Sequence, residues 1–292
     1  MSNSPRISVV TPSYQQASFL EQTIRSVLDQ GYPNLEYIVM DGGSTDGSVE
    51  IIERYADRLS FWVSESDDGQ SDAINKGFAH ATGDIYCWIN SDDYLEPNSL
   101  ERVAKYFVEH PECEVLHGVC RCVDESGRDQ SAEPLRMMKG TVPEALATWT
   151  QNWFAQQSTF WRADLWKDVG GLDCSLHYAM DYDLWQKFAA RTTFHVISDV
   201  LASYRFHQAA KCSADWGKLI AEIVDVQARH SASGMRSTLF HFRSLIDQFN
   251  QREQQLNAQL DSALNHRAQA AIVERIKSRV IRVARSLGLV RG

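Results

Sequence analysis

The stretch that decides the fold is Ile85-Tyr86-Cys87-Trp88-Ile89-Asn90-Ser91-Asp92-Asp93. Its apolar half predicts a buried strand over residues 84–89, and four polar residues follow at once. Two adjacent carboxylates at the end of a buried strand are unfavourable unless a cation offsets their charge. Mg²⁺ or Mn²⁺ would do so through hard oxygen ligands. A helix cap is the alternative, because Asp93 stands just before Leu95-Glu96-Pro97.

The first hundred residues alternate short apolar runs with segments of helical spacing. Strands are predicted over residues 7–11, 35–40, 60–64 and 84–89, and helices over 19–28, 48–55 and 72–80. Ser18 is the expected N-cap of the first helix. This alternation predicts an α/β fold, a doubly wound and mostly parallel sheet with helices on both faces.

Ligands of such a sheet bind at the carboxyl ends of its strands. The loops there are 11–14, 41–44, 65–69 and 90–93, and three of the four carry carboxylates. Tyr14 could stack on a base, Thr11 could hydrogen-bond one, and Asp41 could accept a hydrogen bond from an imide N–H such as that of uracil. Gly42 and Gly43 allow close approach of the backbone. Each residue alone could be a turn or cap, but together they indicate a nucleotide pocket.

Composition narrows the class of protein. The chain has 292 residues, is 43% hydrophobic and carries a formal charge of −9, which argues against nucleic-acid binding by bulk electrostatics. The first residues lack the pattern of a signal peptide, and no stretch approaches a membrane span. We therefore expect a protein that is soluble or held at a membrane surface. Its six cysteines are expected to be free thiols, and the pair Cys120-x-Cys122 has poor geometry for zinc.

The C-terminal part changes character twice. Residues 216–266 are polar and helical in pattern, which predicts a helical extension. Residues 267–292 predict a basic amphipathic helix, with seven Lys or Arg residues against one Glu. Such a helix suits an anionic membrane surface. Docking to a partner, or to a second copy as a homo-oligomer, is the alternative.

Eight ordered blocks between Ile7 and His207 resemble the family 2 glycosyltransferases, which have the GT-A fold. The blocks are 9–14 (VVTPSY), 41–47 (DGGSTDG), 72–77 (DAINKG), 90–93 (NSDD), 157–162 (QSTFWR), 169–173 (VGGLD) and 180–185 (MDYDLW), followed by 204–207 (YRFH). They cover about two hundred residues in order, and any one block alone would be weak. The resemblance implies a GT-A domain over 5–215, with a nucleotide-binding half (5–98) and an acceptor-binding half (99–215).

The resemblance also implies roles for individual positions. Residues expected to hold the nucleoside are Thr11, Pro12, Tyr14 and Asp41. Asp72 and Lys76 would reach the ribose–diphosphate or the sugar. Asn90 stands where many relatives have the first Asp of an acidic triplet, so a ribose contact by Asn90 and the neighbouring Ser91 is expected in altered form. The metal ligands would be Asp92 first and Asp93 second, with His207 closing the site.

Glycosyl transfer with inversion needs one base to take the proton of the acceptor hydroxyl. Asp181 matches the Asp of the family's Glu-Asp motif, where Met180 replaces the Glu. Asp183 is the rival base, although in a helix the two lie on different faces. Asp181 could also be the N-cap of its helix. Trp153, Gln156 and Gln157 are expected on the acceptor side.

Other classes of protein fit the sequence less well. A sugar-nucleotide nucleotidyltransferase would carry a glycine-rich loop with a basic residue after the first strand, where this chain has Thr-Pro-Ser-Tyr-Gln-Gln. A dehydrogenase would carry GxGxxG there. A processive synthase would bring membrane spans and a Gln-x-x-Arg-Trp motif. A catalytically degenerate transferase that serves as a membrane or partner scaffold is opposed by the joint retention of Asp92, Asp93, Asp181 and His207.

The resulting expectation is an inverting enzyme that depends on Mn²⁺ or Mg²⁺. It would transfer a single sugar from a nucleotide-sugar, with a UDP-sugar favoured, to a hydroxyl of a glycan or lipid-linked acceptor. The setting implied is cell-surface polysaccharide biosynthesis, in the cytoplasm and peripheral on the inner face of the membrane, without a nucleic-acid partner.

Overall fold

The computed structural model describes residues 4–130, 154–207 and 216–230 of the chain. Eight strands in these residues form one sheet, in the order β3-β2-β1-β4-β7-β6-β8-β5. The strands are β1 (Ile7–Ser13), β2 (Leu35–Asp41), β3 (Phe61–Ser64), β4 (Ile85–Trp88), β5 (Tyr94–Leu95), β6 (Val115–Val123), β7 (Thr159–Arg162) and β8 (Phe194–Arg205).

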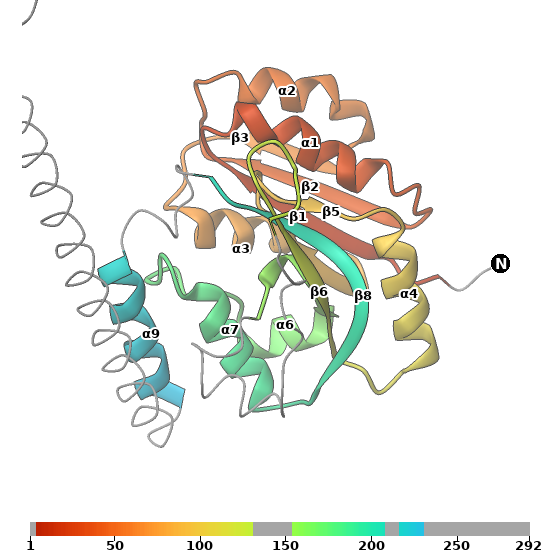
Figure 1. The fold of residues 1–292 in the computed structure, drawn as a ribbon, viewed down its shortest axis with the longest axis vertical. Coiled ribbons are helices and arrows are strands. Elements are labelled where there is room, and N and C mark those ends of the chain that lie inside the picture. Colours follow the sequence, from red (N-terminus) through yellow and green to blue (C-terminus); the bar gives the residue numbers. More distant parts are fainter. Residues whose placement is uncertain (1–3, 131–153, 208–215, 231–292) are drawn as a thin grey trace, which may run out of the picture. The chain divides into compact units, whose positions relative to one another are not determined.

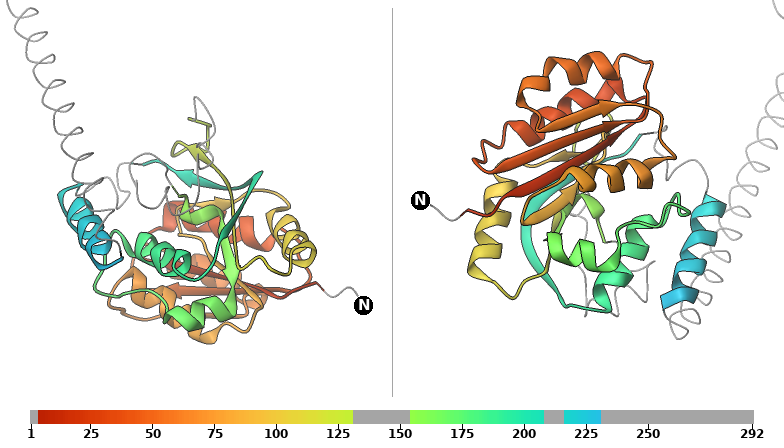
Figure 2. Two further views of the ribbon diagram at one scale, coloured as in Figure 1. Left: turned by 90° about the horizontal axis from the view of Figure 1, so that it is seen from below. Right: turned by 180° about the vertical axis from the view of Figure 1, so that it is seen from behind.

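The helices connect and cover these strands. They are α1 (Ala17–Leu28), α2 (Ser48–Arg54), α3 (Gln70–His80), α4 (Ser99–Glu109), α6 (Ala163–Val169), α7 (Met180–Ala189) and α9 (Trp216–His230), with short 3₁₀ turns η1 (Ala56–Arg58) and η2 (Gln156–Ser158). Figure 1 shows α1 and α2 on one side of the first strands and α3 on the other, and Figure 2 shows the same arrangement from behind. The predicted α/β class with helices on both faces is therefore confirmed.

The parallel half of the sheet positions the loops that matter. β1 pairs in parallel with both β2 and β4, and β2 pairs in parallel with β3. The register aligns Ser13 with Asp41 and Asp41 with Ser64, so the loops after these strands leave from the same edge. The chain order reverses at β1, between β2 and β4, and this is where an open α/β sheet forms its ligand crevice.

The antiparallel strand β7 joins this half to the rest of the sheet. β7 pairs with β4 on one side and β6 on the other, and β6 runs parallel to the long strand β8. The last residues of β8 therefore return towards the loop after β4, because β5 directly follows that loop and pairs with β8 at Tyr94↔Ser203. This pairing brings residues around 204–207 beside residues 90–93.

A cluster of aromatic side chains fills the core between the sheet and α7. Trp88, Trp161 and Trp185 are each at most 1% exposed. The ring of Trp185 on α7 stacks on that of Trp88 on β4, with centroids 6.0 Å apart and planes inclined by 8°. Burial of such rings is among the largest packing contributions a core offers. The stacking of Trp185 on Trp88 fixes α7 against β4, the strand that precedes the acidic pair Asp92-Asp93.

Two expectations about helix ends are wrong. α1 begins at Ala17 rather than after Ser18, and its N-cap is Gln16. α7 has Ala179 as its N-cap, so Asp181 lies inside the helix. Among the described residues, the five cysteines are free thiols, as expected.

None of the described helices is long and apolar enough to cross a membrane. α9 forms the first part of the predicted extension 216–266. The remainder of that extension and the predicted basic helix 267–292 lie outside the described residues, as does Trp153.

Candidate functional site

Asp93 is buried and its carboxylate is used by the protein itself. It is 1% exposed. Its Oδ1 accepts a hydrogen bond from the backbone N–H of Arg205 at 2.9 Å, and its Oδ2 accepts bonds from Gln157 Nε2 at 2.8 Å and Asn90 Nδ2 at 3.2 Å. Burial, together with the neighbouring Asp92 charge, raises the pKa of Asp93 well above its usual value, against the effect of these three donors. Its expected role as a metal ligand stays a prediction.

Asp92 faces a different partner and remains partly accessible. Its Oδ2 lies 3.0 Å from Nε2 of His207, with the Asp92 side chain 21% exposed and the His207 side chain 2% exposed. The His207 ring in turn packs against the ring of Phe19, with centroids 4.8 Å apart. Two positions predicted from motifs 115 residues apart are thus brought together. The helix-cap alternative for the pair is wrong, because α4 begins at Ser99 with Asn98 as its N-cap.

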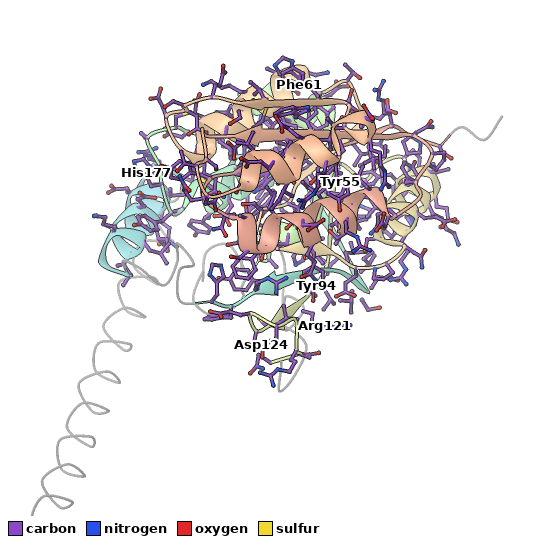
Figure 3. All side chains as sticks on the ribbon, turned by 90° about the horizontal axis from the view of Figure 1, so that it is seen from above. Tyr55, Phe61, Tyr94, Arg121, Asp124 and His177 are labelled. Carbon is purple, nitrogen blue, oxygen red and sulfur yellow. The ribbon has the colours of Figure 1, made fainter. Side chains whose placement is uncertain are left out.

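Arg205 fixes the backbone of this turn, and sequence reasoning missed it. Its guanidinium donates to the Asp92 carbonyl oxygen at 2.9 Å, to Gln22 Oε1 at 2.6 Å and to the Glu125 carbonyl oxygen at 2.7 Å. It also lies over the rings of Phe19 and Tyr94. Tyr94 and Asp124, on the elements that surround this side chain, are labelled in Figure 3. The block 204–207 pointed to the region, but nothing in the pattern distinguished a buried arginine from an exposed one.

Asn90 takes the place of an expected carboxylate for a visible reason. Its amide nitrogen donates to Asp93 Oδ2 at 3.2 Å and to Gln156 Oε1 at 3.3 Å, and its amide oxygen accepts from Gln70 Nε2 at 2.8 Å. A carboxylate at this position would face the buried carboxylate of Asp93. Gln156 also donates to the Trp88 carbonyl oxygen at 2.7 Å. Gln156 and Gln157 therefore hold the turn formed by residues 90–93 through these hydrogen bonds. Their expected place on the acceptor side stays a prediction.

The remainder of the turn is anchored on α1. Ser91 is 5% exposed. Thr23 Oγ1 lies 3.0 Å from the Ser91 carbonyl oxygen and 2.6 Å from the Asp93 carbonyl oxygen. The turn 90–93 is thereby held by contacts from α1, β8 and η2, which leaves the Asp92 carboxylate as its most accessible acidic group.

Asp92 and His207 could provide two ligands to a divalent cation whose remaining ligands are phosphate oxygens and water. Within residues 4–130, 154–207 and 216–230, no cluster of three or more His, Cys, Asp or Glu side chains is arranged to hold a metal ion. Mg²⁺ and Mn²⁺ sites in phosphate-handling enzymes commonly use one or two protein ligands, because phosphate oxygens and water supply the others. A carboxylate and an imidazole 3.0 Å apart match that pattern better than a closed structural site.

The residues predicted to hold the nucleoside are placed at the same sheet edge, but several are already engaged. Thr11 is fully buried, with its hydroxyl 2.9 Å from the Tyr37 hydroxyl, and Pro12 is buried beside it in β1. Asp41 is 2% exposed and accepts hydrogen bonds from the backbone N–H groups of Gly43 and Ser44 and from the hydroxyls of Ser44 and Ser64. Direct contact of Thr11 or Asp41 with a base stays a prediction, while their structural role is evident.

The side chains of Tyr14 and Asp67 both lie close to Gly42. Tyr14 is 62% exposed. A Cβ atom at position 42 would lie 2.9 Å from Asp67 Oδ2 and 3.2 Å from Tyr14 Cδ2, so a larger residue here would displace the Asp67 carboxylate or the Tyr14 ring. Asp67 Oδ1 accepts the backbone N–H of Gly69 at 2.8 Å. The sequence indicated an acidic loop at 65–69, but it could not single out Asp67 as the carboxylate next to the exposed aromatic ring.

Asp72 and Lys76 form an ion pair at the start of α3. Lys76 Nζ lies 2.7 Å from Asp72 Oδ2, and the Asp68 backbone N–H also donates to that oxygen at 3.1 Å. The hydrogen bond with Lys76 lowers the pKa of Asp72, and the same contact raises the pKa of Lys76. The Lys76 side chain is 42% exposed, and its expected contact with a nucleotide-sugar stays a prediction.

The two carboxylates of α7 have distinct environments. Asp183 is 2% exposed, with Oδ2 2.8 Å from Lys187 Nζ and Oδ1 2.8 Å from His230 Nε2. Asp181 is partly exposed, and its Oδ1 accepts the backbone N–H of Tyr182 at 2.7 Å. Met180, the departure from the Glu-Asp pattern, is 6% exposed with its sulfur 2.9 Å from the Ser71 hydroxyl. The geometry favours Asp181 over Asp183 as a group that can reach a ligand.

Known proteins similar to this chain include glycosyltransferases. Residues 8–166 match the sequence pattern of the protein family described as glycosyl transferase family 2. An uncharacterized glycosyltransferase of Rickettsia typhi is 28% identical over 209 residues, which cover 70% of this chain and 65% of that protein. The Bacillus subtilis protein TuaG, named for teichuronic acid biosynthesis, is 35% identical over 108 residues, covering 36% of this chain and 43% of TuaG. The chain thus spans less than two thirds of the length of these relatives.

Solved structures share the fold. TarS of S. aureus, residues 1–349 in complex with UDP-GlcNAc, superposes with a TM-score of 0.62 at 20% identity, over 80% of this chain and 69% of that one. The mannosyltransferase PcManGT of Pyrobaculum calidifontis, in complex with GDP-Man and Mn²⁺, gives a TM-score of 0.54 at 20% identity, over 82% and 65% of the two chains.

Proposed function

Because this chain belongs to glycosyl transferase family 2, we propose that it transfers a single sugar, with inversion, from a nucleotide-sugar to a hydroxyl of a glycan or lipid-linked acceptor. The observation that carries the proposal is the convergence of three predicted groups on β4. Asp92 follows that strand, His207 lies 3.0 Å from Asp92, and the helix of Asp181 is stacked on the same strand through Trp185 and Trp88.

A divalent cation, Mn²⁺ or Mg²⁺, is part of the proposal, and Asp92 and His207 would hold it. Bound there, it would supply positive charge to the diphosphate that leaves. The chain's own groups prepare this site: Arg205 fixes the Asp92 backbone, and the Phe19 ring packs against the His207 imidazole. Lys76 would leave Asp72 to contact the diphosphate, since its side chain is exposed enough to do so.

A uridine donor is favoured by the pair of groups around Gly42. The Tyr14 ring would stack on the base, and the Asp67 carboxylate beside it would accept the imide N–H of uracil. Thr11, Pro12 and Asp41 would form the wall of this pocket, with Asp41 holding the 42–44 backbone in place. The TarS structure that shares this fold contains UDP-GlcNAc, which supports a uridine donor, whereas PcManGT contains GDP-Man.

The proposed base is Asp181. Its carboxylate would take the proton of the acceptor hydroxyl as that oxygen attacks the anomeric carbon, on the face opposite the departing diphosphate. A single displacement of this kind inverts the anomeric centre. Asp183 is unsuited to the role because Lys187 and His230 occupy its two oxygens.

The setting proposed is cell-surface polysaccharide biosynthesis at the inner face of the membrane. Similarity to TuaG supports the pathway class. The basic residues of 267–292 support contact with an anionic surface, by the sequence pattern alone.

The test is a donor screen by thermal shift, with and without Mn²⁺, followed by turnover of the best donor. We expect a UDP-sugar to raise the unfolding temperature only with the cation present. In Asp92→Asn the UDP-sugar should no longer raise the unfolding temperature when the cation is present. The control Asp57→Asn, which changes an exposed carboxylate on η1, should behave as wild type. Nucleotide binding without turnover of any donor would refute transfer and favour a scaffold.

A further inference from the structure

Helix α9, which the sequence assigned to an extension beyond the catalytic domain, contacts the start of the helix that carries Asp181. Figure 1 shows α9 beside the segment that leads into α7, and His177, at the start of that segment, is labelled in Figure 3. Three apolar side chains of α9 are buried, namely Leu219, Ile223 and Val226, as is the polar side chain of Gln227. The helix is therefore packed on the domain and is not merely tethered to it.

The carboxylate of Glu222 receives three consecutive backbone N–H groups. His177 N donates to Oε1 at 3.0 Å, and Tyr178 N and Ala179 N donate to Oε2 at 2.6 and 2.9 Å. Ala179 is the N-cap of α7, which lacks a side-chain cap from its own residues. An acidic group at this end satisfies orphan N–H groups and interacts favourably with the helix dipole. Glu222 thus holds, from another helix, the N-cap N–H of α7 and the N–H groups of the two residues before it.

Other α9 side chains hold the residues that immediately follow Asp181. Gln227, which is 1% exposed, donates to the Tyr182 hydroxyl at 2.9 Å, and His230 Nε2 lies 2.8 Å from Asp183 Oδ1. Arg229 pairs with Asp173 at 2.7 Å, upstream of the same segment. Residues on both sides of Asp181 are therefore bound to one helix, while Trp185 fixes α7 from the sheet side.

We propose that Glu222 is a positioning residue for the Asp181 carboxylate, acting through the three N–H groups of residues 177–179. The inference rests on the proposed role of Asp181 as the base. A base must lie within hydrogen-bond reach of the acceptor hydroxyl, and displacement of a reacting group by about 1 Å can lower the rate on the order of 10²-fold. Loss of Glu222 frees the backbone directly before the base, whereas the nucleotide-binding loops after β1 to β4 keep their own anchors. The effect should therefore fall on kcat and not on donor binding.

The experiment compares Glu222→Ala and Glu222→Gln with Asp225→Ala, a matched control that removes an exposed carboxylate three residues along the same helix. We expect Glu222→Ala to lower kcat by about 10- to 100-fold with the donor KM and the nucleotide Kd unchanged. Glu222→Gln keeps one acceptor oxygen and should restore part of kcat. A general loss of folding would instead change binding and turnover together. Asp225→Ala should match wild type.

Amide hydrogen exchange of residues 177–179 provides a readout independent of turnover. Faster exchange in Glu222→Ala, with unchanged exchange around 90–93, supports the proposal. Wild-type kcat in Glu222→Ala, or unchanged exchange at 177–179, overturns it. If Glu222→Ala does not fold, the same two readouts on Glu222→Gln decide. Absence of turnover in the wild-type protein would count against the proposed transferase function, and the exchange measurement would still decide whether Glu222 holds this segment.

Discussion

The two carboxylates at the start of α7 should respond in opposite ways to the same substitution. Asp181→Asn changes a partly exposed group that accepts the adjacent Tyr182 N–H at 2.7 Å, a bond that the amide oxygen of asparagine can still accept. Asp183→Asn removes the charge of a group that is 2% exposed and paired with both Lys187 and His230 at 2.8 Å. The first change should act on turnover and the second on stability.

The magnitudes follow from those environments. Loss of a general base lowers turnover by about 10²- to 10⁴-fold, so Asp181→Asn should fall in that range with little change in stability. The amide introduced by Asp183→Asn keeps one acceptor for His230 but loses the ion pair with Lys187, and interactions of a buried charged group contribute about 1.5–3 kcal/mol. Because Lys187 is 25% exposed and can be solvated, Asp183→Asn should destabilise by about 2–3 kcal/mol. For a domain of this size that lowers the unfolding midpoint by about 5–10 °C.

The assay measures unfolding by circular dichroism and turnover of the donor at a temperature well below both midpoints. We expect Asp181→Asn to unfold like wild type and to turn over the donor about 10²- to 10⁴-fold more slowly. Asp183→Asn should unfold earlier and keep most of its turnover while folded. The reverse pattern, with full turnover in Asp181→Asn and a specific loss in Asp183→Asn, would refute the assignment of the base.

Three further predictions concern a buried histidine, a tightly packed glycine and the C-terminal segment. Burial lowers the pKa of His117 from 6.5 to about 3. Below pH 6.5 the unfolded chain therefore binds a proton at His117 that the folded chain does not bind. The free energy of unfolding consequently has its full value above pH 6.5 and decreases as the pH falls. Between pH 7 and pH 5 the free energy of unfolding of the wild type, measured with urea, should decrease by about 2 kcal/mol more than that of His117→Asn. Gly83→Ala places a Cβ 2.9 Å from the Arg6 carbonyl oxygen and from Ser8 N, and should destabilise by about 1–3 kcal/mol; an unchanged unfolding midpoint would contradict this. Truncation after His266 should leave turnover intact and reduce sedimentation with anionic vesicles; equal sedimentation would exclude the membrane interpretation of 267–292.

The alternating half of the fold could be predicted closely from the sequence because parallel strands are buried on both faces. Continuous apolar runs between helical segments therefore mark each strand, and the predicted ends of these first strands and helices lie within two residues of the observed ones. The start of α1 could not be predicted from local signals. Its first N–H groups are bound by residues at and before the start of α2, since Gln16 N donates to the Ser48 hydroxyl and Ala17 N donates to the Asp46 carboxylate.

The sequence indicated which residues lie together at the candidate site, but not how their side chains are oriented. Motifs indicated Asp92, Asp93 and His207, yet only the structure shows that Asp92 faces His207 while Asp93 faces Arg205 N, Gln157 and Asn90. The deciding partners come from 64 and 112 residues away for Gln157 and Arg205. No pattern within a sequence window reports such contacts, and the same applies to Glu222 and the segment 177–179.

Both departures from the family pattern remove a carboxylate from a place where the chain could not support it. An Asp at position 90 would bring a second carboxylate to about the 3.2 Å that now separates Asn90 Nδ2 from Asp93 Oδ2, a repulsion on the order of 5 kcal/mol at an effective dielectric of about 20. A Glu at position 180 would enter a site that is 6% exposed and faces Ser71. With Asn90 and Met180 in place, the accessible acidic groups of these two motifs are Asp92 beside His207 and Asp181 on α7. This division supports one carboxylate for the cation and one for the base, because neither then shares its charge with a close acidic neighbour that faces the same ligand.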